Sequence, residues 1–224
     1  MSVVRLALVS TMSIQSIATA STVTLSAIAP LVAAAIGMPS SFIGTYVCFI
    51  YIGAAFAAVA GGTMVTRYGG IHVSQGCLIL AAIGLMLSAV ANFWCICLGG
   101  LLLGLSYGPI TPASSDILAH TVPKERMGFV FSLKQTAVPL GSALAGFIVP
   151  SVALWANNWQ AGPHVMAIFA LSVALLVLYH RSSLDDHFDP RSRFSIHTVL
   201  NALRLVTSQA GLRRMCIVFF VYNG

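Results

Sequence analysis

Charged side chains are scarce in this sequence of 224 residues: Lys and Arg number 11, Asp and Glu number 5, and together they make up 7% of the chain. A soluble globular domain carries about 25% charged residues, so this chain has too few to cover a water-facing surface. The scarcity argues against a soluble enzyme, a nucleic-acid-binding domain and a disordered chain. Hydrophobic residues make up 58%, which instead predicts a polytopic membrane protein.

Familiar catalytic and metal-binding groupings are also missing. The sequence has no paired acids, no H-E-x-x-H motif and no Ser, His and Asp arrangement typical of hydrolases. Its five cysteines lie in apolar stretches, and Cys95 and Cys97 would project from different faces of a helix, which argues against a zinc site or a redox pair. We therefore expect no enzymatic activity, no cofactor and no metal.

Six apolar stretches have, or nearly have, the length of a transmembrane helix, which needs about 20 residues. They cover about 6–36, 42–65, 73–91, 94–115, 129–154 and 164–179, and one charge, Lys134, lies inside the fifth. Helices are expected because hydrocarbon offers no partner to an unpaired backbone group. The predicted fold is an all-α membrane protein, a bundle of six transmembrane helices.

The basic residues predict the orientation of this bundle. Ten of the 11 Lys and Arg residues precede the first stretch, follow the sixth, or lie in the second-to-third and fourth-to-fifth connections. The positive-inside rule therefore places the N-terminus and the long segment after the sixth stretch in the cytoplasm. Trp94, Trp155 and Trp159 fall at the opposite boundary, as an aromatic belt would. The basic excess thus reflects topology, and we expect no nucleic-acid partner.

The N-terminus allows one alternative interpretation, a cleaved signal peptide. Arg5 precedes an apolar run that reaches Ala18-Thr19-Ala20, which resembles a cleavage site. Cleavage there would leave the apolar segment 21–37 outside the membrane, so we favour an uncleaved first span.

The composition divides the chain into three parts. Residues 1–180 are predicted to form the six-helix bundle, and residues 181–212, rich in Arg and Asp, a cytoplasmic interdomain loop. Residues 213–224 begin a seventh apolar stretch that covers less than half of the membrane thickness. We therefore expect a fragment of a longer protein or the product of a truncated gene.

The connection between the second and third spans, Gly62-Thr-Met-Val-Thr-Arg-Tyr-Gly-Gly-Ile71, resembles the signature loop of the major facilitator superfamily, G-x-x-x-D-R-x-G-R-R. The matching positions are Gly62, Arg67 and Gly69, and the differing ones are Thr66, Gly70 and Ile71. The segment Pro123-Lys-Glu-Arg126 is also similar to a loop of that family. The resemblance implies the N-terminal half of a twelve-helix facilitator fold.

In the family, the signature loop latches the protein in one conformation, so Gly62, Arg67 and Gly69 are candidate residues of a conformational loop. Asp116 lies near the same membrane edge, where we expect an ion pair with Arg67 or Arg126. An ordinary positive-inside arginine is the alternative role for Arg67.

The glycines of this loop predict its backbone. Gly69 and Gly70 permit positive φ in a tight turn, and Gly61 and Gly62 allow a close approach of helices at the end of the second span.

Two other family signatures are absent. The fourth span contains no arginine of the kind found in proton-coupled members, and Pro139–Gly146 lacks the glycine pattern of antiporters. The resemblance therefore does not predict antiport.

Polar side chains inside the spans mark a candidate solute pathway. In the first span they recur every three or four residues, on one helix face: Thr11, Gln15, Thr19, Thr22 and Ser26. Tyr107, Thr111 and Ser114 repeat this spacing in the fourth span, where Pro109 and Pro112 should bend or break the helix. Hydrogen bonds between helices are the alternative role for these side chains.

Lys134 is the charge that lies well inside a span, with Gln135 beside it and Gly141 further along, on what we expect to be an open face towards the bundle. Charges at this depth are expensive and usually functional, and an anionic solute is one partner that could neutralise it. The segment 134–141 is also similar to the fifth span of some bacterial facilitators of small organic anions. A lysine that snorkels to the membrane edge is the alternative.

The predicted function is secondary-active or facilitative transport of a small solute by alternating access, with a weak preference for organic anions. The expected partners are the lipid bilayer, a small-molecule solute, and a missing C-terminal half or a second copy, and the expected location is a bacterial inner membrane. The alternative is a truncated membrane remnant or assembly partner that does not transport.

Overall fold

The computed structural model describes residues 3–179, 204 and 208–223. Its helices are α1 Val3–Ala27, α2 Ala29–Ile36, α3 Phe42–Tyr68, α4 Gly70–Ser88, α5 Phe93–Tyr107, α6 Ile110–Thr121, the 3-10 helix Lys124–Arg126, α7 Met127–Gln135, α8 Ala137–Trp155, α9 Ala161–Tyr179 and α11 Ala210–Asn223. Most of the predicted interdomain loop lies outside the described residues. The helix α11 contains the apolar stretch of the predicted seventh span, and that role stays a prediction.

Six membrane-spanning segments are found, and the all-α prediction is confirmed. They are Val3–Ala27, Phe42–Tyr68, Gly70–Ser88, Phe93–Thr121, Lys124–Trp155 and Ala161–Tyr179. The third begins three residues earlier than predicted, because the preceding turn is a single residue. The fifth contains Lys134 and is still apolar enough to span a membrane.

Three of the long apolar segments are broken into two helices. The first breaks at Ile28, before Pro30, and the fourth breaks at Gly108 and Pro109 as predicted. The fifth breaks at Thr136, three residues before Pro139. Proline cannot donate a backbone hydrogen bond and its ring crowds the preceding turn, so each of these breaks has a local cause.

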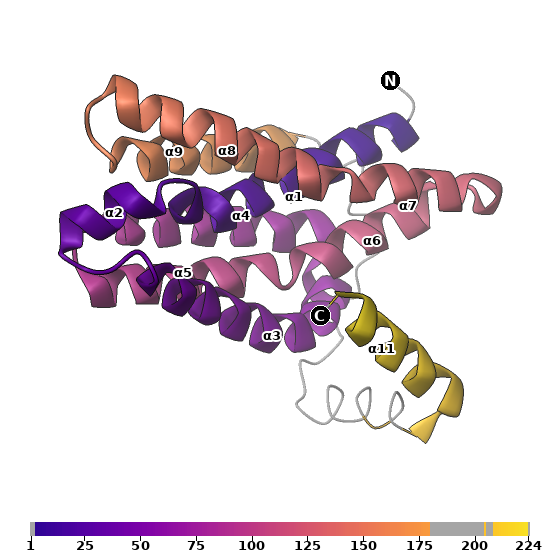
Figure 1. The fold of residues 1–224 in the computed structure, drawn as a ribbon. Helices are drawn as coiled ribbons and strands as arrows, with labels where there is room; N and C mark the ends of the chain where they lie inside the picture. The colour runs from indigo at the N-terminus through magenta and orange to yellow at the C-terminus, as the bar shows by residue number, and fades with distance from the viewer. Residues whose placement is uncertain (1–2, 180–203, 205–207, 224) are drawn as a thin grey trace.

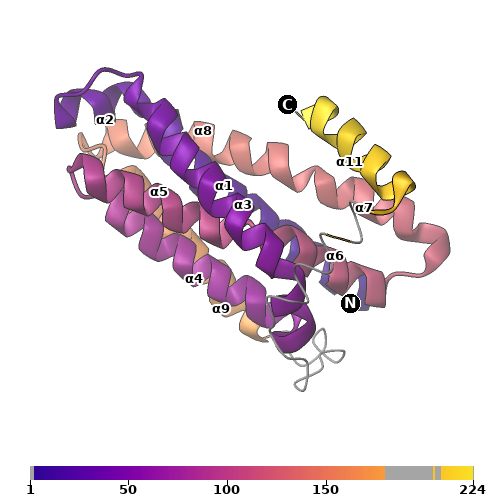
Figure 2. The same ribbon diagram turned by 90° about the horizontal axis from the view of Figure 1, so that it is seen from below.

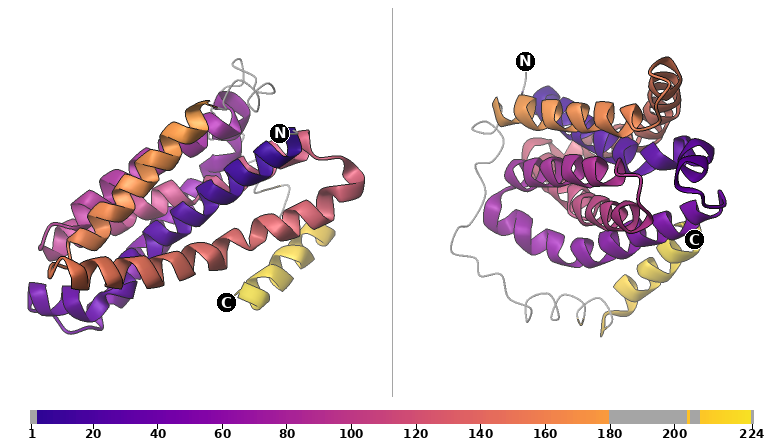
Figure 3. Two further views of the ribbon diagram at one scale, coloured as in Figure 1. Left: turned by 90° about the horizontal axis from the view of Figure 1, so that it is seen from above. Right: turned by 90° about the vertical axis from the view of Figure 1, so that its left-hand side faces the viewer.

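Helices α1 to α9 form one bundle with their long axes roughly side by side, and α11 lies outside it (Figures 1 and 2). The largest interfaces join α3 to α5, α4 to α5, α1 to α8 and α4 to α9. Glycine makes close contact possible in the first of these, because a Cβ atom on Gly104 would overlap the backbone of α3 at Ile50 and Ala54. Gln75 of α4 donates to the carbonyl oxygen of Ala174 in α9 (3.2 Å), and this hydrogen bond links the two helices. Figure 3 shows the same packing from above and end-on.

The turn between α3 and α4 consists of Gly69 alone, with φ +87° and ψ 150°. The predicted positive φ is confirmed at Gly69 and is wrong at Gly70, which already belongs to α4. Gly70 instead allows close packing: an added Cβ would lie 2.8 Å from the carbonyl oxygen of Ala113 in α6.

The predicted close approach at the end of α3 is confirmed for one glycine of the pair. A Cβ on Gly61 would lie 3.0 Å from the Pro112 side chain and 3.1 Å from Pro109. A Cβ on Gly62 would meet no described atom within 4 Å, so the prediction is wrong there. Gly61 therefore packs directly against α6, and Gly62 does not.

At the other end of the bundle from Gly69, the α4–α5 turn and the α8–α9 turn are in contact. Gln160, in the α8–α9 turn, donates from Nε2 to the carbonyl oxygen of Ala89 in the α4–α5 turn (2.8 Å). Trp94 at the start of α5 and Trp155 at the end of α8 lie at this rim and are 73% and 89% exposed. Trp159 packs against the core beside them. All three tryptophans therefore share one end, while Arg67 and the Lys124–Arg126 helix lie at the other, which we call the basic end.

Candidate functional site

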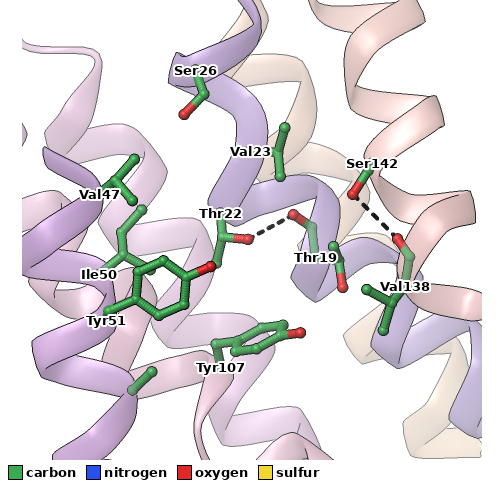
Figure 4. A pocket seen from close by; sticks show the side chains of 11 residues that line it. Thr19, Thr22, Val23, Ser26, Val47, Ile50, Tyr51, Tyr107, Val138 and Ser142 are labelled. Carbon is green, nitrogen blue, oxygen red and sulfur yellow. Dashed lines mark hydrogen bonds between the residues drawn. The ribbon is translucent and has the colours of Figure 1, made fainter. Parts of the chain in front are cut away.

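A pocket of about 390 Å³ opens between α1, α3, α5 and α8. Figure 4 shows Tyr51 of α3 and Ser142 of α8 on opposite sides of it, with the α1 threonines between them and Tyr107 below. Hydroxyl groups gather here within an otherwise apolar bundle. The lining residues are Thr19, Thr22, Val23, Ser26, Val47, Ile50, Tyr51, Ala54, Tyr107, Val138 and Ser142.

The structure brings four of the predicted pathway residues together in this pocket: Thr19, Thr22, Ser26 and Tyr107. The spacing of polar residues along the first span predicted the two threonines and Ser26. The proline break after Tyr107 predicted a site in the fourth span, and Tyr107 is the last residue of α5 before that break.

Sequence reasoning missed Tyr51 and Ser142. Tyr51 is one aromatic residue among many in an apolar run, which gave no signal. Ser142 follows Gly141, and its spacing from other polar residues did not mark a face. Their role depends on which faces of three distant helices meet, and periodicity along one helix carries no such information.

The pocket hydroxyls of α1 and α8 bond to their own helices. Thr19 Oγ1 donates to the carbonyl oxygen of Gln15 (2.9 Å), and Thr22 Oγ1 donates to that of Thr19 (2.8 Å). Ser142 Oγ donates to the carbonyl oxygen of Val138 (3.3 Å). Such bonds satisfy a hydroxyl locally and let the helix tolerate it in an apolar setting. The alternative role, hydrogen bonding between helices, fits a different residue: Ser16 donates to the carbonyl oxygen of Ala137 in α8 (3.0 Å).

Gln15 lies behind the pocket and is 2% exposed. Its Nε2 atom donates to the Tyr107 hydroxyl oxygen (3.4 Å), which links α1 to the end of α5. Its Oε1 atom is buried and has no hydrogen-bond partner among the described residues. Gln15 therefore positions Tyr107 and does not itself line the pocket.

Thr111 and Gln135 are not brought into the pocket. Both side chains are exposed, Thr111 on α6 and Gln135 at the end of α7. The break at Gly108 and Pro109 separates Thr111 from Tyr107, so the spacing that would align them on one continuous helix no longer applies.

Lys134 also lies outside the pocket lining. Its side chain is 3% exposed, and Nζ donates to the Ser115 hydroxyl of α6 at 3.4 Å. Among the described residues, no carboxylate lies within 4.0 Å of this ammonium group. The expected open face at Gly141 is wrong, because an added Cβ there would overlap the Ser16 backbone of α1.

A second cavity, of about 470 Å³, lies at the basic end between α3, α6 and α7. Gly62, Thr66 and Asp116 line it, so two of the predicted conformational-loop residues meet there. Asp116 Oδ1 lies 3.6 Å from His120 Nδ1, a contact within α6 that replaces the ion pair we expected with Arg67 or Arg126. The Arg67 guanidinium instead lies 5.1 Å from the centre of the Tyr68 ring.

The model of the family described as Major Facilitator Superfamily matches residues 11–224. A search of curated proteins finds no match. The family match covers every pocket residue and both ends of the bundle.

Proposed function

Because the chain belongs to the major facilitator superfamily, we propose that it takes part in secondary-active or facilitative transport of a small solute by alternating access. The family carries out transmembrane transport and is not enzymatic, and the chain is a multi-pass membrane protein. The six spanning helices form half of a facilitator fold. The solute would bind in the pocket between α1, α3, α5 and α8.

One observation carries this proposal: hydroxyl groups from four helices gather in one pocket of an apolar bundle (Figure 4). Polar groups inside a membrane are costly and tend to mark solute pathways. Interrupted helices near such groups are typical of transporter binding sites. Here α5 ends at Tyr107, in the pocket, and α8 begins just before Val138, which also lines it.

A second bundle would form the opposite wall of the pathway. It would come from a C-terminal half or from a second copy of this chain, with the two bundles rocking around the site. The distribution of Lys and Arg supports a cytoplasmic N-terminus and basic end. The location that we propose is a bacterial inner membrane.

Cysteine labelling from both sides of the membrane tests this proposal without knowledge of the solute. The native cysteines are first replaced, and Ser142→Cys is then compared with Ser151→Cys. Both serines lie in α8 and donate to the carbonyl oxygen four residues earlier, Ser151 to Phe147 (2.7 Å). Nine residues of helix separate them, which places Ser151 on the opposite face from the pocket.

We expect a water-soluble thiol reagent to label Ser142→Cys when added to either side of sealed vesicles, because alternating access exposes the site to each side in turn. Ser151→Cys should react slowly from both sides. Labelling of Ser142→Cys from one side alone would contradict alternating access and favour the alternative, a membrane remnant or assembly partner that does not transport.

A preference for organic anions is a second candidate, favoured by the buried ammonium of Lys134. Among the described residues, this ammonium group makes a 3.4 Å hydrogen bond to Ser115 and no ion pair, and buried charges are normally paired. A turn of α7 about the break at Thr136 would be needed to carry Lys134 towards the pocket.

A further inference from the structure

We propose that the pocket recognises its solute through hydrogen-bond donors on the solute, and that the solute presents hydroxyl or amine groups, and no anionic group, to this wall. This inference rests on the proposed transport function and names its substrate class. It starts from the direction of the hydrogen bonds that the pocket hydroxyls already make.

A hydroxyl group has one proton to donate and two lone pairs that accept. A carbonyl oxygen can only accept, so Thr19, Thr22 and Ser142 must each use their proton on the backbone of their own helix. What they offer to the pocket is oxygen lone pairs. Figure 4 shows two of these bonds, from Thr22 to Thr19 in α1 and from Ser142 to Val138 in α8. Three lining groups are therefore fixed as acceptors.

Three lining groups remain able to donate: the hydroxyl of Ser26 and the phenols of Tyr51 and Tyr107. Tyr107 accepts a hydrogen bond from Gln15 Nε2, so its own proton stays available. A phenol can act in either direction and can match a hydroxyl group on the solute. The pocket thus offers fixed acceptors and adaptable phenols, a combination that suits polyols and amines.

An anionic group would be poorly served at this wall. No charged side chain lines the pocket, and a carboxylate needs donors for about four lone pairs. A carboxylate here would find at most three hydroxyl protons, those of Ser26, Tyr51 and Tyr107, and would face three fixed acceptors, so its hydration would be only partly replaced, which is costly in an apolar setting.

Gln15 adds an independent observation that points the same way. Its Oε1 atom is a buried acceptor without a partner among the described residues, one contact behind Tyr107. Buried polar atoms are normally satisfied. Gln15 Oε1 therefore adds one more acceptor beside the three fixed acceptors of the pocket lining.

The test compares three probes that share one carbon chain: sorbitol, gluconate and 1-amino-1-deoxysorbitol. They present a hydroxyl, a carboxylate and an ammonium at the same carbon. Binding is measured as thermal stabilisation of the purified full-length protein, and uptake is measured in proteoliposomes. We expect sorbitol or its amine to stabilise the protein and to enter at rates above those of empty vesicles, and gluconate to do neither.

Substitutions in α1 test whether the preference for hydrogen-bond donors on the solute depends on the fixed acceptor Thr22. Thr22→Val removes the oxygen with little change of shape, and should weaken binding of the active probe about three- to tenfold, the range for one hydrogen bond. Thr22→Ser keeps the oxygen and should restore binding. Thr24→Val is the matched control, because Thr24 makes the same kind of bond, to Ala20 (2.8 Å), and does not line the pocket.

Stronger stabilisation or faster uptake with gluconate than with its partners would overturn the proposal, as would no response to any of the three probes. Equal binding by Thr22→Val and the parent protein would also overturn it. If only the proposed substrate class were wrong, Ser142→Cys would still be labelled from both sides in all of these cases. The experiments therefore distinguish a failure of the substrate class from a failure of the proposed transport function.

Discussion

The α4–α9 pair and the pocket wall solve different problems within one bundle. The helix α4 is unbroken, and 61% of the residues in its most apolar stretch are buried. The corresponding share is 22% in α3 and 28% in the segment that contains α7 and α8. The pair is joined by the Gln75 bond to Ala174. Of the wall segments, α3 and the segment of α7 and α8 leave large surfaces uncovered, whereas α1 and the segment of α5 and α6 are 50% buried, and α9, the partner of α4, is 39% buried. Three of the spans that supply the wall break beside the pocket. The unbroken and largely buried α4 supports the bundle, and the wall provides the polar groups and the breaks in the helices.

The helix α8 packs on α1 with one face, while its other residues border the pocket or face outwards. Two glycines of α8 show the difference between these faces. Gly141 allows contact with the Ser16 backbone, while a Cβ on Gly146 would meet no described atom within 4 Å. Changes at these two sites separate packing from the general effect of removing a glycine.

The largest effect is expected for Gly141→Ala. The added methyl group overlaps backbone of α1, which cannot move as a side chain can, so we expect a loss of about 3 kcal/mol of stability. Thermal melting of the detergent-purified protein measures it. Gly146→Ala is the control and should be neutral or slightly stabilising, because alanine favours helix. Equal melting temperatures of the two variants would show that α1 and α8 are less tightly packed than described.

The next largest effect is expected for Gly69→Val. A β-branched residue at φ +87° and ψ 150° is strained, and we expect a cost of about 2 kcal/mol. Because the turn also connects α3 to α4, membrane expression should persist while the two-sided labelling of Ser142→Cys slows. Gly62→Val is the control, since Gly62 has free space around its Cβ position. Unchanged labelling in Gly69→Val would make the turn a simple connector.

A smaller effect is expected for Lys134→Gln. The substitution removes one long hydrogen bond to Ser115, so stability should change by about 1 kcal/mol or less. The selectivity between sorbitol and gluconate should stay the same, because Lys134 does not line the pocket. Lys124→Gln, in the exposed 3-10 helix at the basic end, is the control. A selective loss of gluconate uptake in Lys134→Gln would support the organic-anion candidate.

The smallest effect on stability is expected for two substitutions of exposed residues that test the topology. Asn158→Cys and Glu125→Cys each replace an exposed residue, one at the tryptophan end and one at the basic end. An impermeant thiol reagent outside intact cells should label Asn158→Cys and leave Glu125→Cys unlabelled. The opposite pattern would reverse the predicted orientation and place the basic end outside.

The sequence predicted the spans, the helix break at Pro109 and the polar face of the first span, because each depends on the local order of residues, but it did not predict the breaks at Ile28 and Thr136. It did not predict how the helices turn towards one another. Lys134 and Gln135 are adjacent, yet one is buried and the other exposed, and the break at Thr136 shifts α7 relative to α8. Tyr51 and Ser142 join the pocket through contacts between segments far apart in the chain, which no single stretch of sequence encodes.

The shared rim of Trp94, Trp155 and Trp159 makes intrinsic fluorescence a local signal in this chain. All three indoles, the full set in the sequence, lie at the end tied together by the Gln160 bond to Ala89, so none reports from the basic end. Two are largely exposed and one is packed against the core, so emission combines surface and interior environments. A spectral change on adding a solute would therefore register movement at that rim, and a solute that moved only the Gly69 turn would leave the spectrum unchanged.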